Sequence, residues 1–146
     1  MELEFWKDKG KKQIDPELFS TKAESLANQI SSESSDRTNN PTQVRKFYDE
    51  VLRFDSMLKT IPEENQREEF GKLLPYIKML NAKAAYALGR NELVSQGFKD
   101  FINTAVKKVN DKDDFDAFTG FFEAFMGFYK FAYKNKKERN LTGGRR

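Results

Sequence analysis

The 146-residue sequence predicts an all-α protein, a single-domain bundle of about five helices. Apolar residues recur at three- and four-residue spacings along several segments, which places them on one face of an α-helix. No segment alternates polar and apolar residues between turn signals, as a half-buried strand would. A chain of this length can bury one stable core without covalent links, so one domain accounts for the whole pattern.

We divide the chain into three parts by composition. Residues 1–15 are expected to be a loose N-terminal segment, unless Phe5 and Trp6 dock on the rest of the protein. Residues 16–136 carry the helical bundle. Residues 137–146, which end in GGRR, are expected to form a flexible basic tail with weak affinity for anions.

The first half of the bundle contains two expected helices and a linker. Asp15 and Pro16 favour a helix start, because aspartate caps helices and proline suits their first position. That helix covers residues 16–30. Residues 31–41, SSESSDRTNNP, are too polar to join a core and are expected to be a linker. A second helix covers residues 42–60.

Three further helices complete the prediction, over residues 62–89, 94–109 and 114–136. Pro75 lies inside the first of them, and its ring presses on the carbonyl four residues back, so we expect a kink there. The acidic residues 111–116 precede the last helix, where carboxylates cap the first turn and offset the helix dipole.

Composition excludes several kinds of active site. The sequence has no cysteine and no histidine, which removes thiolate nucleophiles, zinc–thiolate sites and serine–histidine triads. We therefore predict no catalytic residue, no metal site and no cofactor. No stretch is apolar enough for a signal peptide or a membrane span, so we expect a cytoplasmic protein with no membrane partner.

Residues 71–91 contain four cations and no acid. On a helical wheel, one stripe of this segment alternates cations and aromatic rings, opposite the apolar face. A row of cations along a helix suits a row of RNA phosphates. The alternative, which the sequence leaves open, is a solvated face whose cations pair with acids of another helix. The cations of the segment are Lys72, Lys78, Lys83 and Arg90.

A second basic face lies on the helix of residues 42–60. Lys46 and Arg53 are seven residues apart and share a face, with Arg45 to one side. Pairing within the helix, with Asp49 and Glu50, is the favoured alternative for these cations, since acids stand three or four residues from each.

The last helix carries more aromatic residues than one core face requires. Phe121 and Phe128 lie on a different side from the main apolar stripe, among small residues. We expect these two rings to form a subunit interface and the protein to self-associate. The alternative is a central helix that is wrapped on most sides.

Three stretches, TQVRKFYDEVLRFD, FGKLLPYIKMLNAKAAYALGR and FFEAFMGFYKF, follow in this order within residues 16–135. Together they resemble the small subunit of type III-A CRISPR effector complexes, the Csm complexes. The resemblance implies an all-helical subunit of an antiviral ribonucleoprotein, stacked beside a filament of backbone subunits. Such a subunit holds the duplex of crRNA and target RNA through backbone contacts, while the backbone and large subunits perform the reactions.

The resemblance also implies the RNA-binding positions, and wheel geometry adds Lys72 and Lys130. We keep two other functions open: a helical adaptor whose basic stripe meets an acidic protein, and, ranked last, an enzyme that uses carboxylates alone. The positions implied by the resemblance are Arg45, Lys46, Arg53, Lys78, Lys83 and Arg90.

Overall fold

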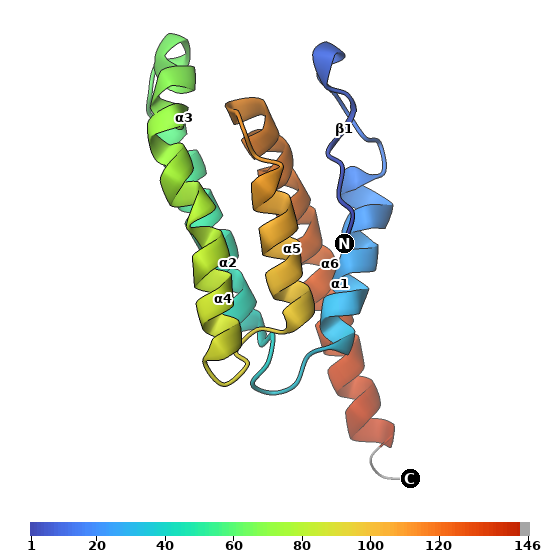
Figure 1. Ribbon diagram of the computed structural model, residues 1–146. Helices are drawn as coiled ribbons and strands as arrows, with labels where there is room; N and C mark the ends of the chain where they lie inside the picture. The colour runs from blue at the N-terminus through green and yellow to red at the C-terminus, as the bar shows by residue number, and fades with distance from the viewer. Residues whose placement is uncertain (144–146) are drawn as a thin grey trace.

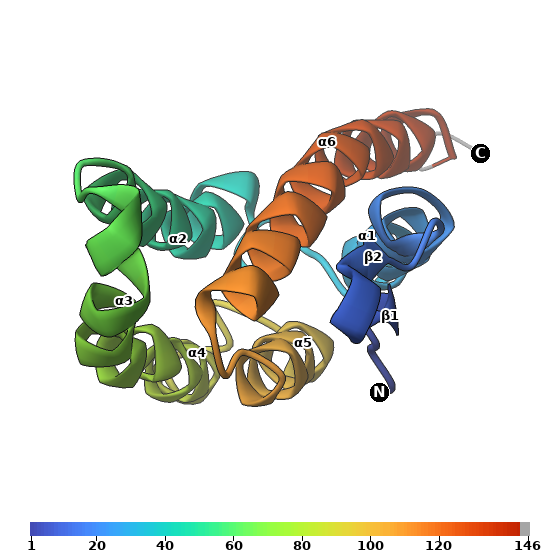
Figure 2. The same cartoon turned by 90° about the horizontal axis from the view of Figure 1, so that it is seen from above.

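The computed structural model describes residues 1–143, and within them the protein is all-α apart from one small hairpin. The all-α class is confirmed. In Figure 2, α6 runs diagonally through the middle of the protein, with α2 and α3 on one side and α1 on the other. The helices are α1 (Ala23–Ser32), α2 (Pro41–Lys59), α3 (Glu63–Lys78), α4 (Leu80–Gly89), α5 (Gln96–Lys107) and α6 (Lys112–Gly143).

The core is rich in phenylalanine and lies where α5 meets α6. The ring of Phe101 is within 5.8 Å, centroid to centroid, of the rings of Phe121, Phe122 and Phe125. Phe121 is completely buried, so the expectation that it forms a subunit interface is wrong. Phe128 is half-buried and packs against the same core. The wrapped-helix alternative is therefore the correct one for Phe121, because α6 has neighbours on both sides (Figure 2).

The N-terminal segment is docked rather than loose. Strands β1 (Trp6–Asp8) and β2 (Gln13–Ile14) pair antiparallel on either side of a 3-10 turn, η1 (Lys9–Lys11). Leu3 and Phe5 are buried, and the indole nitrogen of Trp6 donates a hydrogen bond to Asp114 at 2.8 Å. The expectation of a loose segment allowed one exception, that Phe5 and Trp6 dock on the rest of the protein, and the structure shows this docking. A π-helical turn, η2 (Leu18–Lys22), then leads into α1, so the α-helix starts later than expected.

The expected linker of residues 31–41 is part of the packed structure. Its first two residues end α1, and Asn39 is fully buried in a left-handed backbone conformation. The Asn39 amide donates to the hydroxyl of Ser95 at 2.8 Å, and the Ser95 N–H donates back to the amide oxygen at 2.8 Å. The Tyr129 hydroxyl donates to the Asn39 carbonyl. Satisfied hydrogen bonds allow Asn39 to be buried although it is polar, while Ser35, Asp36 and Arg37 of the same segment stay exposed.

The segment expected as one helix over residues 62–89 is divided into α3 and α4. Pro75 lies within α3, and the interruption falls at Met79, four residues beyond the expected kink. The amide of Met79 is shared between the carbonyls of Pro75 and Tyr76, at 3.1 and 3.2 Å, before the helix resumes at Leu80. The single expected helix is therefore interrupted at this tightened turn, after Pro75.

The last helix is longer than expected. It extends through residues 137–143, which we had assigned to a flexible tail, and the remaining tail residues 144–146 lie outside the described residues. The physical reason is that residues 128–141 contain no glycine or proline, and most of them favour helix. Figure 1 shows this end of α6 projecting beyond the other helices.

Candidate nucleic-acid interface

A basic groove of about 310 Å³ lies between α2 and α4. Figure 2 places both helices on the same side of α6. The floor of the groove is apolar, from Phe47, Leu80, Ala87 and Leu93. We call it the α2/α4 groove. Its polar lining is Gln43, Lys46, Glu50, Lys83, Tyr86 and Arg90.

Helical spacing brings these polar side chains together. Lys46 and Glu50 are four residues apart on α2, and Lys83, Tyr86 and Arg90 follow at spacings of three and four, so each set shares one face of its helix. The opposite faces are anchored in the core by buried apolar side chains, which fixes the direction in which the polar faces point. Three predicted RNA-binding residues therefore meet in one groove, although they lie far apart in the sequence.

Glu50 is the acid of this groove and binds two cations. Its Oε1 atom lies 2.8 Å from the guanidinium of Arg53 and 3.1 Å from the ammonium of Lys83. Hydrogen bonding, from Arg53 first and then from Lys83, lowers the pKa of Glu50 from 4.5 to about 2. The carboxylate is thus ionised at neutral pH. The expectation of an unneutralised stripe is wrong for Lys83, because its partner stands on a different helix.

Two cations of the groove have no carboxylate partner among residues 1–143. Lys46 is exposed and forms no ion pair there, since the acid four residues later is taken by Arg53 and Lys83. Arg90 donates only to the hydroxyl of Tyr86, at 3.4 Å. The ring of Tyr86 is 66% exposed. The groove thus presents two unpaired positive charges beside an open aromatic ring.

The other five predicted RNA-binding residues do not line this groove. Arg53 instead holds Glu50, as described above. Arg45 pairs with Asp49 at 3.5 Å and Lys72 with Glu69 at 3.0 Å, both on exposed helix faces. Lys130 is exposed on α6.

The ammonium of Lys78 is directed into the protein. It donates to the carbonyl of Val106 at 2.8 Å, near the end of α5, and burial lowers its pKa. This carbonyl also accepts the amide of Val109 at 3.2 Å, and a lysine near the C-terminal end of a helix interacts favourably with the last carbonyls. We therefore correct the expectation that Lys78 contacts RNA, since its charge is used within the bundle.

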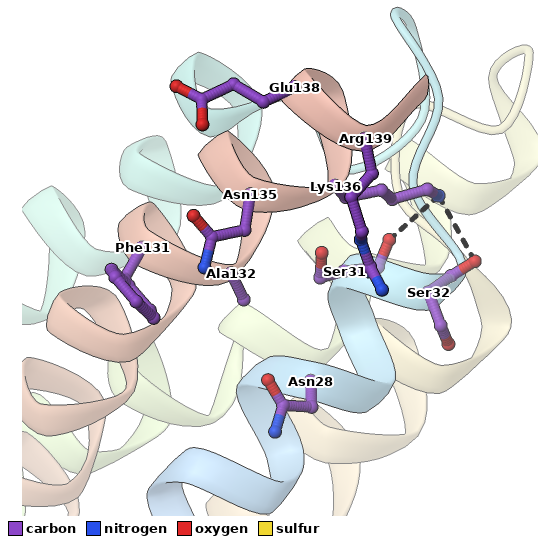
Figure 3. Close-up of a pocket in the computed structure, with 9 residues that line it drawn as sticks. All are labelled: Asn28, Ser31, Ser32, Phe131, Ala132, Asn135, Lys136, Glu138 and Arg139. Atoms are coloured by element: carbon purple, nitrogen blue, oxygen red, sulfur yellow. Dashed lines mark hydrogen bonds between the residues drawn. The ribbon is translucent and has the colours of Figure 1, made fainter. Parts of the chain in front are cut away.

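A hollow of about 630 Å³, larger than the α2/α4 groove, lies elsewhere, between α1 and α6. Figure 3 shows Lys136 reaching from α6 toward the last residues of α1. Its ammonium donates to the carbonyls of Ser31, at 3.0 Å, and Ser34, at 2.6 Å. This lysine caps the negative end of α1. Because that charge is already used, the hollow suits a polyanion less well than the α2/α4 groove.

The predicted site residues do not include one exposed aromatic residue of α6. Phe131 lies beside the hollow of Figure 3 and is 67% exposed. Its position on the helical wheel, away from the core stripe of the last helix, is the signal that could have identified it. Gln43 was also missed, because a single glutamine carries no pattern.

The described residues hold no group of three or more acidic side chains placed to bind a metal ion. Acids at the start of α6 act as caps, as predicted: Asp111, just before the helix, accepts from the amide of Asp114 at 2.8 Å, and Asp114, in its first turn, accepts from the amide of Asn110 at 3.0 Å. In residues 1–143, every helix is too short or too polar to span a lipid bilayer.

These observations define a class of protein: a small all-α bundle with a basic groove between two of its helices. The family model for Csm2 of type III-A matches residues 13–136, which is most of the chain. The chain belongs to the Csm2 family, the small subunit of the type III-A CRISPR complex. The searches of curated proteins and of solved structures found no significant match. The first strand of the hairpin and the last turns of α6 lie outside the matched residues.

Proposed function

We propose that this protein is a non-catalytic small subunit that holds the duplex of crRNA and target RNA by its backbone. Membership of the Csm2 family supports a place in a multi-subunit type III-A complex. In this proposal, the partners are the two RNA strands and the backbone and large subunits, and the complex serves antiviral defence in the cytoplasm. The protein contributes a basic surface rather than a reaction.

The observation that carries the proposal is the pair of unpartnered cations in the α2/α4 groove. Lys46 and Arg90 come from different helices, and neither is bound to a carboxylate in the part of the chain that the structure describes. Cations that neutralise phosphates release bound counterions, which supplies most of the sequence-independent affinity for nucleic acid. Arginine and lysine contacts to phosphate position an RNA without reading its sequence.

The ion pairs around Glu50 are compatible with this role. The side chains of Lys83 and Arg53 are 50% and 54% exposed. Exposed ion pairs contribute little net free energy in water. An RNA phosphate can therefore replace the carboxylate as the partner of Lys83 at small cost, and the groove gains a third cation contact when RNA is present.

Phe131 is the residue that we propose for contact with another subunit, in place of Phe121 and Phe128. It is a large exposed ring near the end of α6, and aromatic residues are enriched at protein interfaces. The proposed partner is another subunit of the same complex, which includes a second copy of this chain.

Isolation from cells tests the function most broadly. A tagged copy of the full chain is purified with its partners, and any RNA that is bound is sequenced. We expect small RNAs that carry CRISPR repeat sequence, together with the other type III-A subunits. Purification of the chain with neither would contradict the proposal.

A second candidate, a helical adaptor for an acidic protein, is favoured by one observation. Tyr76, Met79 and Tyr86 are exposed by 58%, 47% and 66% along the outer faces of α3 and α4, and such a stripe also suits a protein partner. An adaptor would keep its partner when RNA is added in excess. An RNA-binding subunit would release a protein that competes for the same cations.

A further inference from the structure

The α2/α4 groove has the size and lining of a site for a small group rather than for a smooth rod. Its volume of about 310 Å³ is at the lower limit for pockets that enclose small ligands. It combines an apolar floor, an amide from Gln43, two unpaired cations and one open ring. Phosphate contacts alone would require only the cations. The ring and the floor need another explanation.

Tyr86 provides a surface on which a base can stack. It lines the groove, its ring is mostly exposed, and its hydroxyl is held by the guanidinium of Arg90 at 3.4 Å. In a paired RNA helix, the faces of the bases are covered by their neighbours. Aromatic side chains therefore stack on bases that are unpaired, in loops, bulges or single strands.

We propose that the α2/α4 groove holds one unpaired nucleotide, its base on the ring of Tyr86 and its phosphate between Lys46 and Arg90. The Gln43 amide lies in the same groove and can donate to and accept from a base edge. This inference rests on the proposed function and deepens it. The subunit would hold the duplex through its cations and would bind an unpaired nucleotide by stacking.

Tyr76 offers a matched control within the same protein. It is an exposed tyrosine like Tyr86, but it lies on α3 and does not line the α2/α4 groove. If exposed tyrosines act only as general contacts to RNA, both should matter equally. If the groove is a nucleotide site, only Tyr86 should matter.

The test compares two RNAs that bind the full chain: a short, fully paired duplex, and the same duplex with one unpaired adenosine. Binding is followed by NMR titration, which measures weak affinities. The wild type should bind the RNA with the unpaired adenosine more tightly. Tyr86→Leu should weaken binding of that RNA by about tenfold and leave the paired duplex unchanged, because a stacked base contributes on this order. Tyr76→Leu should change neither.

The outcomes separate this inference from the proposed function. Equal binding of the two RNAs by the wild type overturns the inference and leaves duplex binding intact. Equal weakening of both RNAs by Tyr86→Leu also overturns it. Binding of neither RNA overturns the inference and the proposed function together. Should Tyr86→Leu prove unfolded, Tyr86→Phe keeps the ring, and it must keep the preference for the unpaired adenosine.

Discussion

Lys83 of α4 and Arg53 of α2 bind the same oxygen atom of Glu50, at 3.1 and 2.8 Å. One carboxylate thus links two helices that border the groove and neutralises one of two cations. The groove keeps a positive charge from this cluster, in addition to those of Lys46 and Arg90. Glu50 therefore competes with any phosphate that enters.

Replacing Glu50 with glutamine should strengthen RNA binding. Glu50→Gln removes the negative charge and releases Lys83 and Arg53, so the affinity for RNA at low salt should rise. The dependence of log K on log salt should become steeper by about one unit, because one more cation can neutralise a phosphate. Asp49→Asn is the control, since Asp49 pairs with Arg45 outside the groove. A weaker affinity after Glu50→Gln would contradict this account.

The same carboxylate should give the protein a pH dependence in acid. The pKa of Glu50 falls from 4.5 to about 2 on folding, so its ion pairs stabilise the native state above pH 4.5 and lose that effect as the pH falls toward 2. The free energy of unfolding is measured in denaturant across this range. The advantage of the wild type over Glu50→Gln should shrink as the pH falls. A constant difference would show that the pair does not contribute through ionisation.

The buried Asn39–Ser95 pair should be energetically coupled. Asn39→Ala leaves the amide of Ser95 buried without its acceptor, and we expect a loss of about 2 to 3 kcal/mol in the free energy of unfolding. Ser95→Ala removes the hydroxyl that accepts from the Asn39 amide and from the backbone amide of Phe98. The double variant should lose less than the sum of the two, by about 1 kcal/mol. Strict additivity would mean that the two residues act independently.

The Lys136 cap should stabilise the junction between α1 and α6. Lys136→Met keeps the length of the side chain but removes the ammonium that binds Ser31 and Ser34. Because hydrogen bonds to charged groups are stronger than neutral ones, Lys136→Met should lower the free energy of unfolding by about 1 to 2 kcal/mol. Lys134→Met is the matched control, because Lys134 is exposed two residues away on the same helix and makes no ion pair within residues 1–143. Equal effects of the two variants would exclude the cap.

Phe131 should affect assembly but not folding. Because its ring is 67% exposed, Phe131→Ser should leave the thermal unfolding midpoint nearly unchanged. Incorporation into the reconstituted complex should weaken by about fivefold or more, as expected for an interface aromatic. Met57→Ser, at another exposed apolar residue on α2, serves as the control. Normal assembly with Phe131→Ser would place the subunit contact elsewhere.

The helices were predictable from periodicity, because α2 and α5 each bury one clear apolar stripe. The burial of Asn39 was not, since its segment has the composition of a linker and its partners come from α5 and α6. The burial of Phe121 was missed for a related reason. A helical wheel gives the direction of a side chain but not the number of elements around the helix.

The site was predictable in part. Spacing along α4 correctly placed Lys83, Tyr86 and Arg90 on one face. It could not show that the partner of Lys83 would be Glu50, thirty-three residues earlier in the chain. Spacing also suggested a pair between Lys46 and Glu50, but the shorter reach from Arg53 and the approach of α4 took that acid instead.

The most direct test of the central claim is the salt dependence of RNA binding by the assembled complex. Lys46→Ala and Arg90→Ala are introduced together and compared with Lys107→Ala, which removes an exposed cation from α5 outside the groove. The account predicts weaker binding and a slope of log K against log salt that falls by about two units for the double variant, with little change for the control. An unchanged slope and affinity in the double variant would contradict it.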